Sequence, residues 1–160
     1  MDPTLLSKAF HRNTKLVQRH AEGVSHEDSL RQSDHNINCF NWVLGHMVAS
    51  RYDLFRLVDG GPRDDADRFN RYRNESDQVT SESPDVVRLE DLLAGLAESQ
   101  AAFRAWMDSV DEAWLKEETP IGDAMVSRAD QIHFAYFHDT YHTGQIDLLR
   151  QVSGKSDKII

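Results

Sequence analysis

Apolar residues recur every three or four positions in four long stretches of the chain, and this period predicts four α-helices. We expect these helices at residues 4–20, 39–58, 87–110 and 124–152. The strict alternation of apolar and polar residues that is typical of a half-buried strand is not sustained anywhere. The hydrophobic pattern therefore predicts an all-α protein.

Residues that cap or break helices indicate where the elements end. Asn38 is a good N-cap for the second helix, and Gly60-Gly61-Pro62 is a strong stop signal after it. Residues 62–84 are polar and too numerous for a tight turn between two helices. We interpret them as a crossover along the bundle. Residues 1–160 are then a single domain, a four-helix bundle with a long crossover between its second and third helices.

Composition and charge narrow the possible partners. The chain has 160 residues, of which 39% are apolar and 28% are charged, as is usual for one globular domain. It carries 18 Lys and Arg against 27 Asp and Glu, for a net charge of -9 and no basic block. Such a chain is a poor ligand for a phosphate backbone, so we expect no binding to nucleic acid.

The same survey predicts where the protein resides. No apolar run approaches the roughly 18–20 residues that cross a bilayer, and residues 1–8 lack the pattern of a signal peptide. Cys39 is the only cysteine, which excludes an intrachain disulfide and a cysteine-based zinc site. We therefore expect no membrane association and a cytoplasmic protein.

Two histidines stand four residues apart in the predicted fourth helix. His138 and His142 lie on one face of that helix, roughly 5–6 Å apart at Cβ. Phe134 and Ile146 are expected on the same inward face. Each imidazole could simply bond to a neighbour or to buried water. A pair at this spacing favours a shared metal ion, because each unpaired buried polar group costs roughly 1–3 kcal/mol.

A catalytic zinc site usually has three protein ligands, so a third should come from a helix that faces the fourth. His46, at the edge of the apolar stripe of the second helix, is the better candidate. His20, at the end of the first helix, is the alternative. The other histidines are expected on the surface, in loops or off the inward face: His11, His26, His35 and His133.

Four further polar residues are candidates for a role near this pair. Asp139 and Tyr141 are candidate catalytic residues, and Asp139 could orient a ligand imidazole as an outer-shell partner. Arg51 and Gln145 are candidates to bind the substrate. Each has a structural alternative. Tyr141 could pack between helices, Gln145 could be a structural amide, and Arg51 could pair with an inward acid, as a core arginine requires.

Two motifs give the chain a resemblance to a known family. They are Asn38-Cys39-Phe40-Asn41-Trp42-Val43-Leu44-Gly45-His46-Met47-Val48-Ala49-Ser50-Arg51 and His138-Asp139-Thr140-Tyr141-His142-Thr143-Gly144-Gln145-Ile146. With them the sequence resembles the DinB-like superfamily of bacterial metal-binding four-helix bundles. The resemblance implies a site formed by His46, His138 and His142 for zinc, nickel or another divalent ion, and a homodimer. The superfamily includes S-transferases that use small thiols such as bacillithiol or mycothiol.

Three functions are compatible with these features. The leading hypothesis is a divalent-metal-dependent, thiol-dependent S-transferase with a small-molecule substrate. A metal-dependent hydrolase is an alternative, because transfer and hydrolysis both start from a nucleophile that a metal deprotonates. The third is a non-catalytic metal-binding protein that acts through dimerisation. Its interface would use aromatic residues on the flanks of the helices: Trp42, Phe55, Tyr136 and Phe137.

Overall fold

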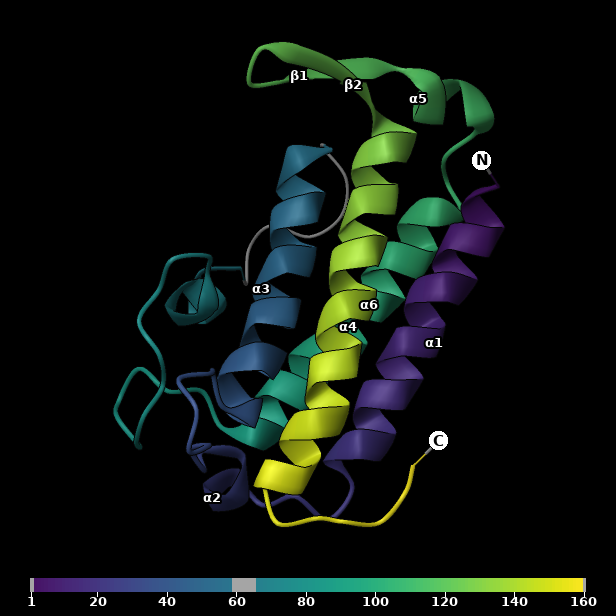
Figure 1. The fold of residues 1–160 in the computed structure, drawn as a ribbon. Coiled ribbons are helices and arrows are strands. Elements are labelled where there is room, and N and C mark those ends of the chain that lie inside the picture. Colours follow the sequence, from purple (N-terminus) through teal and green to yellow (C-terminus); the bar gives the residue numbers. More distant parts are fainter. Residues whose placement is uncertain (1, 59–65, 160) are drawn as a thin grey trace.

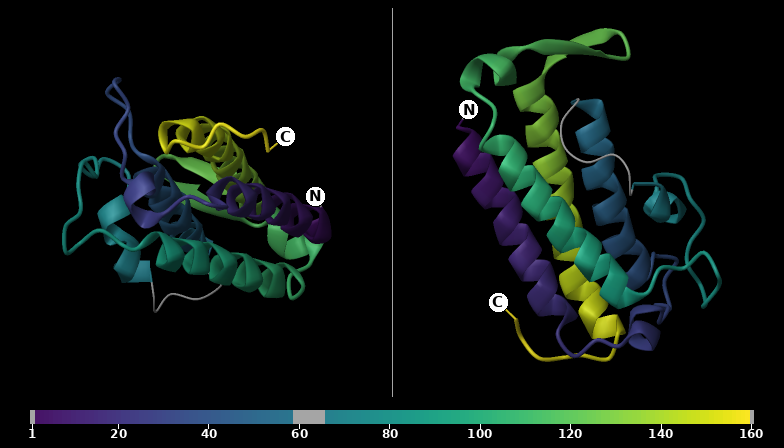
Figure 2. Two further views of the ribbon diagram at one scale, coloured as in Figure 1. Left: turned by 90° about the horizontal axis from the view of Figure 1, so that it is seen from below. Right: turned by 180° about the vertical axis from the view of Figure 1, so that it is seen from behind.

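The computed structural model describes residues 2–58 and 66–159, and its main feature is a bundle of four long helices (Figure 1). Helices α1 (Pro3–Ala21) and α6 (Arg128–Val152) run in one direction, while α3 (Phe40–Leu57) and α4 (Leu89–Met107) run in the other. Around the bundle, α1 packs against α6, α6 against α3, α3 against α4, and α4 against α1 (Figure 2). The predicted all-α four-helix bundle is confirmed.

The crossover between α3 and α4 is anchored by two aromatic side chains. Because α3 and α4 are parallel, the chain has to travel the length of the bundle between them, and the 3₁₀ helix η1 (Ala66–Tyr72) lies against α3 on the way. Phe69 and Tyr72 are fully buried. Each ring lies over a glycine: a Cβ on Gly45 would overlap the ring of Tyr72, and one on Gly95 would lie 2.6 Å from Phe69 Cζ. The two glycines therefore allow the crossover to pack closely on the bundle.

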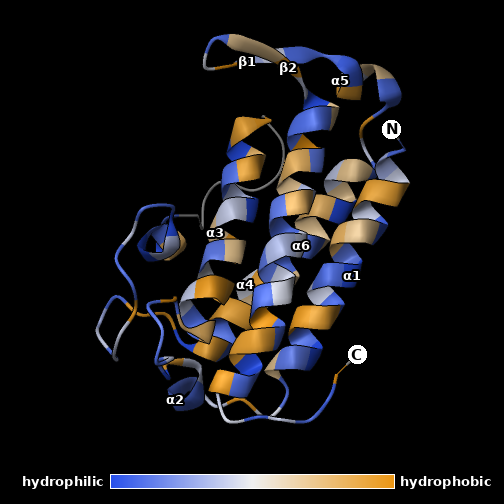
Figure 3. Cartoon of the chain, in the orientation of Figure 1, coloured by the Kyte–Doolittle hydropathy of each residue, from blue (hydrophilic) through white to orange (hydrophobic). Residues whose placement is uncertain are grey.

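The apolar stripes of the four helices merge into one hydrophobic core. Helix α3 is buried around most of its circumference, because α4, α6 and η1 all cover it. In Figure 3 hydrophobic residues are spread along all four long helices, and the crossover is largely hydrophilic. No helix among residues 2–58 and 66–159 is long and apolar enough to cross a membrane.

A β-hairpin was not predicted. After the short helix α5 (Glu112–Lys116), β1 (Glu118–Ile121) pairs antiparallel with β2 (Ala124–Ser127) across the end of the bundle. The prediction that the fourth helix begins at residue 124 was therefore wrong, since α6 begins at Arg128. Strands of four residues are too short to show a period of two along the sequence.

Three other expectations about helices and burial were also wrong. Asn38 does not cap α3; Cys39 occupies the N-cap position, and its side chain makes no capping bond. Phe134 does not face inward but is 67% exposed. His26, in the short helix α2 (His26–Ser29), is buried instead of exposed, because its Nδ1 accepts a hydrogen bond from Leu89 N–H at the start of α4.

One expectation falls on residues outside the described part of the chain, namely the stop signal at Gly60-Gly61-Pro62. The second helix was expected to end at residue 58, and α3 ends at Leu57 with Val58 as its C-cap.

Candidate metal centre

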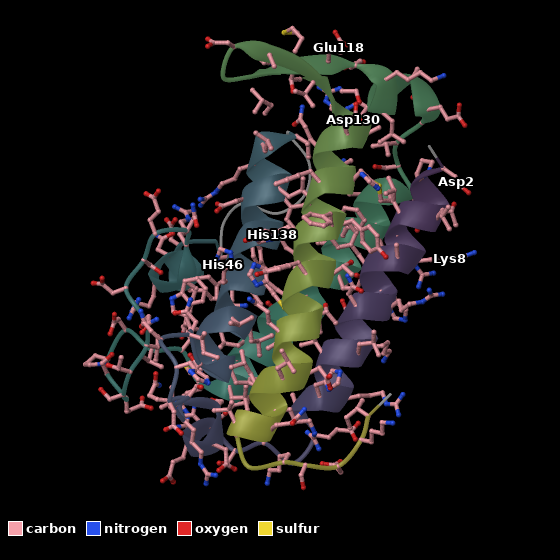
Figure 4. The ribbon with its side chains drawn as sticks, in the orientation of Figure 1. Asp2, Lys8, His46, Glu118, Asp130 and His138 are labelled. Atoms are coloured by element: carbon pink, nitrogen blue, oxygen red, sulfur yellow. The ribbon has the colours of Figure 1, made fainter. Side chains whose placement is uncertain are left out.

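Three histidines from two helices meet in the interface of α3 and α6. His46 comes from α3, and His138 and His142 come from α6. The Nε2 atom of His138 lies 3.2 Å from Nε2 of His46 and 3.1 Å from Nε2 of His142. Figure 4 shows His46 and His138 next to each other at the same level of the bundle. The structure therefore brings together the histidine pair and the preferred third histidine of the sequence analysis.

The outer ring nitrogens of two of these histidines are occupied by acceptors. His46 Nδ1 lies 2.8 Å from the carbonyl oxygen of Tyr72, and His142 Nδ1 lies 2.7 Å from Oε1 of Gln145. A carbonyl oxygen can only accept, so in the neutral imidazole each Nδ1 carries the proton. The lone pair of each Nε2 then points into the cluster. Metal-binding histidines have the same arrangement when their other ring nitrogen donates a hydrogen bond to an acceptor.

The cluster has the donor set and the spacing for a divalent ion. Among three neutral imidazoles of which two are protonated at Nδ1, at most one Nε2 carries a proton, so hydrogen bonds within the cluster cannot satisfy all three. A tetrahedral ion at 2.0–2.1 Å from each nitrogen would set the nitrogens about 3.3 Å apart. The two closest pairs, at 3.1 and 3.2 Å, already approach this separation. Imidazole nitrogen is a common ligand of zinc and nickel.

Burial keeps these imidazoles in the neutral form that binds metal. It lowers the pKa of His46 and of His138, and it lowers the pKa of His142 to about 4. The cause is desolvation, because a charged imidazolium loses its hydration inside the bundle. The neighbouring histidines add a smaller effect in the same direction at His138 and His142. The cluster therefore does not have to lose protons at neutral pH before it can bind a cation.

The cluster opens on one side into a pocket of about 570 Å³, which we call the histidine pocket. A volume of this size suits a small molecule. Tyr141 and Gln145 both line it. Gln145 Nε2 donates a hydrogen bond to the Tyr141 hydroxyl at 3.3 Å, while its Oε1 faces His142. Gln145 therefore connects His142 to a phenol that is 58% exposed and lines the pocket.

Arg51 and Asp139 lie elsewhere than the sequence analysis expected. Both are buried in the core, and they form a bidentate ion pair, with Arg51 Nε 2.8 Å from Asp139 Oδ1 and Nη2 3.0 Å from Oδ2. Asn13 Nδ2 also donates to Asp139 Oδ2 at 2.9 Å. Asp139 therefore faces Arg51 and not a ligand imidazole, and Arg51 does not line the histidine pocket. The structural alternative for Arg51, a pair with an inward acid, is the one that the structure shows.

This ion pair belongs to a polar network that crosses the bundle. Arg51 Nη1 donates to Thr14 Oγ1 on α1 at 3.0 Å, and the Thr14 hydroxyl contacts Gln100 Oε1 on α4 at 3.3 Å. Asp139 lies between His138 and His142 in the sequence of α6. The network thus links all four long helices and holds α6 against α3 at the level where the histidines meet.

Sequence analysis missed Tyr72 as a residue that supports the site. Its carbonyl oxygen orients His46, and its hydroxyl donates to Asn41 Oδ1 at 2.9 Å and accepts from Val87 N–H at 2.8 Å. Burial raises the pKa of Tyr72 to about 12, so its hydroxyl keeps its proton. The available signal was that Phe69 and Tyr72 are the only aromatic residues of the crossover.

The alternative third ligand, His20, is not part of the cluster. It is fully buried at the C-terminal end of α1, and its Nδ1 lies 3.4 Å from Asp147 Oδ1. Desolvation lowers its pKa. Cys39 is buried too, and burial raises the pKa of its thiol, which makes it a poor nucleophile.

The aromatic residues expected on a dimer interface have different environments. Trp42 and Phe55 are buried within the bundle, so they cannot form an exposed interface. Trp42 instead stacks on His46, with ring centroids 4.9 Å apart, and lines the histidine pocket. Tyr136 is half-buried against Phe10, and Phe137 is 61% exposed.

A second hollow lies between α1 and α4, on the edge of the bundle opposite the interface of α3 and α6. This α1–α4 groove has a volume of about 670 Å³ and a charged lining that includes Lys8, Lys15, Arg104 and Asp108. Figure 4 shows Lys8 pointing away from the bundle at this edge. The floor of the α1–α4 groove is formed by three buried residues, Ser7, Thr14 and Gln100.

Comparisons with known proteins agree with this architecture. A profile of the DinB superfamily matches residues 9–146, a range that includes all three histidines of the cluster. Among solved structures, the chain is similar to a conserved protein from Enterococcus faecalis, with a TM-score of 0.74 and 17% sequence identity over 95% of this chain and 97% of that chain. At this identity the likeness shows a shared fold. No curated protein matches the sequence significantly.

Proposed function

The chain belongs to the DinB superfamily, and on that basis we propose that it is a divalent-metal-dependent enzyme that activates a small nucleophile. The activity we propose is thiol-dependent S-transfer. One observation carries the proposal: three histidine nitrogens converge at 3.1 and 3.2 Å beside a pocket with room for a small molecule. Three histidines with an open side are typical of a catalytic zinc site, and four protein ligands of a structural one.

His46, His138 and His142 would hold the ion, with zinc or nickel as the preferred metals. When bound, such an ion stabilises an anion at its open position, so a thiol or a water molecule there is deprotonated at neutral pH. In the reaction we propose, the thiol sulfur forms a bond to an electrophilic carbon of the second substrate. In a substitution the bond from that carbon to its leaving group breaks, and the leaving group takes the electron pair and the proton that the thiol lost. In an addition the π bond at that carbon breaks, and the neighbouring atom takes the electron pair and the proton.

The protein's own residues would hold the ligands and deliver protons. The Tyr72 carbonyl and the Gln145 amide keep the Nε2 atoms of His46 and His142 aimed at the site. The Tyr141 hydroxyl accepts a hydrogen bond from Gln145, so its own proton is available to a leaving group in the pocket. The Arg51–Asp139 pair would act only through position, because both side chains are buried away from the pocket.

Two alternatives remain as proposals with different outcomes. A metal-dependent hydrolase would use water in place of the thiol, with the same ligands. A non-catalytic metal-binding protein would act through a homodimer. Its exposed aromatic residues on α6 would supply the interface: Phe134, Phe137 and Tyr141. The open side of the histidine cluster favours an enzyme over this last alternative.

Metal analysis is the first test. We expect the purified wild-type protein, loaded with zinc or nickel and then dialysed, to retain about one ion per chain. The variants His46→Ala, His138→Ala and His142→Ala should each lose it. His133→Ala is the matched control, because His133 is exposed on the same helix and lies outside the cluster. If the wild type retains no more metal than the three variants, the proposal is wrong.

A thiol assay is the second test. The metal-loaded protein is incubated with low-molecular-weight thiols and a panel of electrophilic acceptors, and the loss of free thiol is followed. We expect turnover that depends on the metal and disappears in His138→Ala. Turnover of ester or amide substrates without a thiol would favour the hydrolase. Retained metal without turnover of either kind would favour the non-catalytic protein.

A further inference from the structure

The histidine pocket is lined almost entirely by neutral side chains. In the part of the chain that the structure describes, twelve residues line the pocket, and none of them carries a charge when histidine is counted as neutral. In the whole chain 28% of residues are charged, so a lining of this size would be expected to include three or so. Besides the three histidines, the polar groups that line it are amides and a phenol: Asn38, Asn74, Gln145 and Tyr141.

The α1–α4 groove shows that the neutral lining is not a general property of the hollows in this protein. That groove is of similar size, yet it includes three cations and one carboxylate. A charged ligand can therefore find an oppositely charged side chain in the α1–α4 groove and not in the histidine pocket.

The walls of the histidine pocket are apolar. Trp42 and Val43 from α3, Ile37 from the preceding loop, and Leu148 and Leu149 from α6 enclose the space beside the histidines. Ile37 is 46% exposed and Leu148 is 63% exposed. Large apolar side chains at the rim of a pocket lose contact with water when a ligand with apolar surface enters, and this favours binding.

We propose that the histidine pocket selects ligands with an uncharged, largely apolar body attached to one metal-binding head group. The role of the head group rests on the proposed function, whereas the preference for an uncharged body rests on the lining alone. Away from the metal-binding head group, a charged group on the body would give up hydration without an oppositely charged side chain to pair with. Amides and a phenol can replace water around neutral polar groups, because they offer both donors and acceptors.

A matched series of aromatic thiols tests the body preference in the metal-loaded protein. Benzyl mercaptan has a neutral body, and its para-carboxylate and para-aminomethyl derivatives carry a negative and a positive charge on the same ring. Fluorescence of Trp42 can follow binding, since this ring lines the pocket. Trp42→Phe identifies its signal among the three tryptophans. We expect the neutral thiol to bind at least tenfold more tightly than both charged ones, and equal or tighter binding of either charged thiol would overturn the proposal.

A second series separates this proposal from the proposed function. Benzamide, benzoate and benzylamine have the same ring and no thiol head, and they are added to the metal-free protein. Benzamide should give the tightest binding of the three. If the protein binds no metal but benzamide is still preferred, the proposed function fails and the body preference stands. If the protein binds metal and neither series shows a preference for the neutral ligand, the body preference fails and the proposed function stands.

A charge placed on the pocket wall gives the final test. Leu148→Glu should weaken binding of benzyl mercaptan. In this variant the para-aminomethyl derivative should gain affinity relative to benzyl mercaptan. Ala101→Glu is the matched control, since Ala101 is exposed on α4 and lines the α1–α4 groove. Both positions are exposed on helices, so circular dichroism should show that both variants fold. An equal effect of the two substitutions on the thiol series would contradict the proposal.

Discussion

Removal of the Asp139 carboxylate should reveal how strongly the buried ion pair determines the geometry of the site. Asp139→Ala leaves the Arg51 guanidinium 5% exposed with two remaining acceptors, Thr14 Oγ1 at 3.0 Å and the Leu96 carbonyl oxygen at 3.4 Å. Neither acceptor carries a charge. The variant therefore retains a buried cation without a counter-ion, a change that typically destabilises a protein by about 3–5 kcal/mol.

The expected shift in melting temperature follows from the size of the chain. An unfolding entropy of about 2.1 cal/mol/K per residue makes 1 kcal/mol worth about 3 °C for a domain of this length, so Asp139→Ala should melt about 9–15 °C below the wild type. Arg51→Met should have a similar effect, because it leaves the carboxylate unpaired. The double variant Arg51→Met/Asp139→Leu should recover at least half of the loss, because no buried charge remains.

Thermal denaturation followed by circular dichroism measures the shifts in melting temperature, and urea denaturation measures the differences in the free energy of unfolding. A chelator is included, so that bound metal does not add to the stability of any variant. Glu98→Ala serves as the control: Glu98 pairs with Arg68 at the surface, where both side chains are well exposed, and an exposed pair contributes at most about 1 kcal/mol. If Asp139→Ala costs no more than Glu98→Ala, the ion pair does not hold the helices as we infer. If the three histidines bind metal as we propose, the metal affinity of the folded variants should fall as well, because Asp139 lies between His138 and His142 in the sequence of α6.

Three further predictions concern the supports of the site and its charge. Gly45→Ala should destabilise the fold by about 1–3 kcal/mol and weaken metal binding about 10–100-fold, because the added Cβ displaces the Tyr72 ring. Gly144→Ala is the control and should have neither effect, because its added Cβ meets no neighbouring atom within 4 Å. Calorimetry measures both the stability and the metal affinity. The metal-free protein should become less stable as the pH falls from 6.5 to about 4. In this range His142 is protonated in the unfolded chain but stays neutral in the folded protein, because burial lowers its pKa to about 4, and this lowers the free energy of unfolding by up to about 3 kcal/mol. Urea titrations that show constant stability over this range would contradict the prediction. His26→Ala should lower stability by about 1–2 kcal/mol, because the N–H of Leu89 at the start of α4 loses its acceptor; hydrogen exchange in the first turn of α4 should increase, and unchanged protection would refute the role.

Several features of the site could be predicted from the sequence, because they depend on local geometry. The spacing of His138 and His142 places both imidazoles on one face of any helix. The period of the apolar residues predicted the four long helices, and the length of the polar segment after α3 predicted the crossover. Arg51, within an apolar stripe, required an acceptor in the core wherever the helix packed.

Only the tertiary structure decided which groups meet across the helices. That Arg51 pairs with Asp139, and that the Tyr72 carbonyl orients His46, depends on how α3, η1 and α6 are placed along one another, and no local pattern encodes that placement. Phe134 was misplaced for a related reason. Periodicity gives the angle of a residue around its own helix, whereas burial depends on how far the neighbouring helices extend around that angle. The sequence by itself therefore determined the pair of histidines and indicated His46 as a third, and the packing of α3 against α6 decided that the three meet beside an open, uncharged pocket.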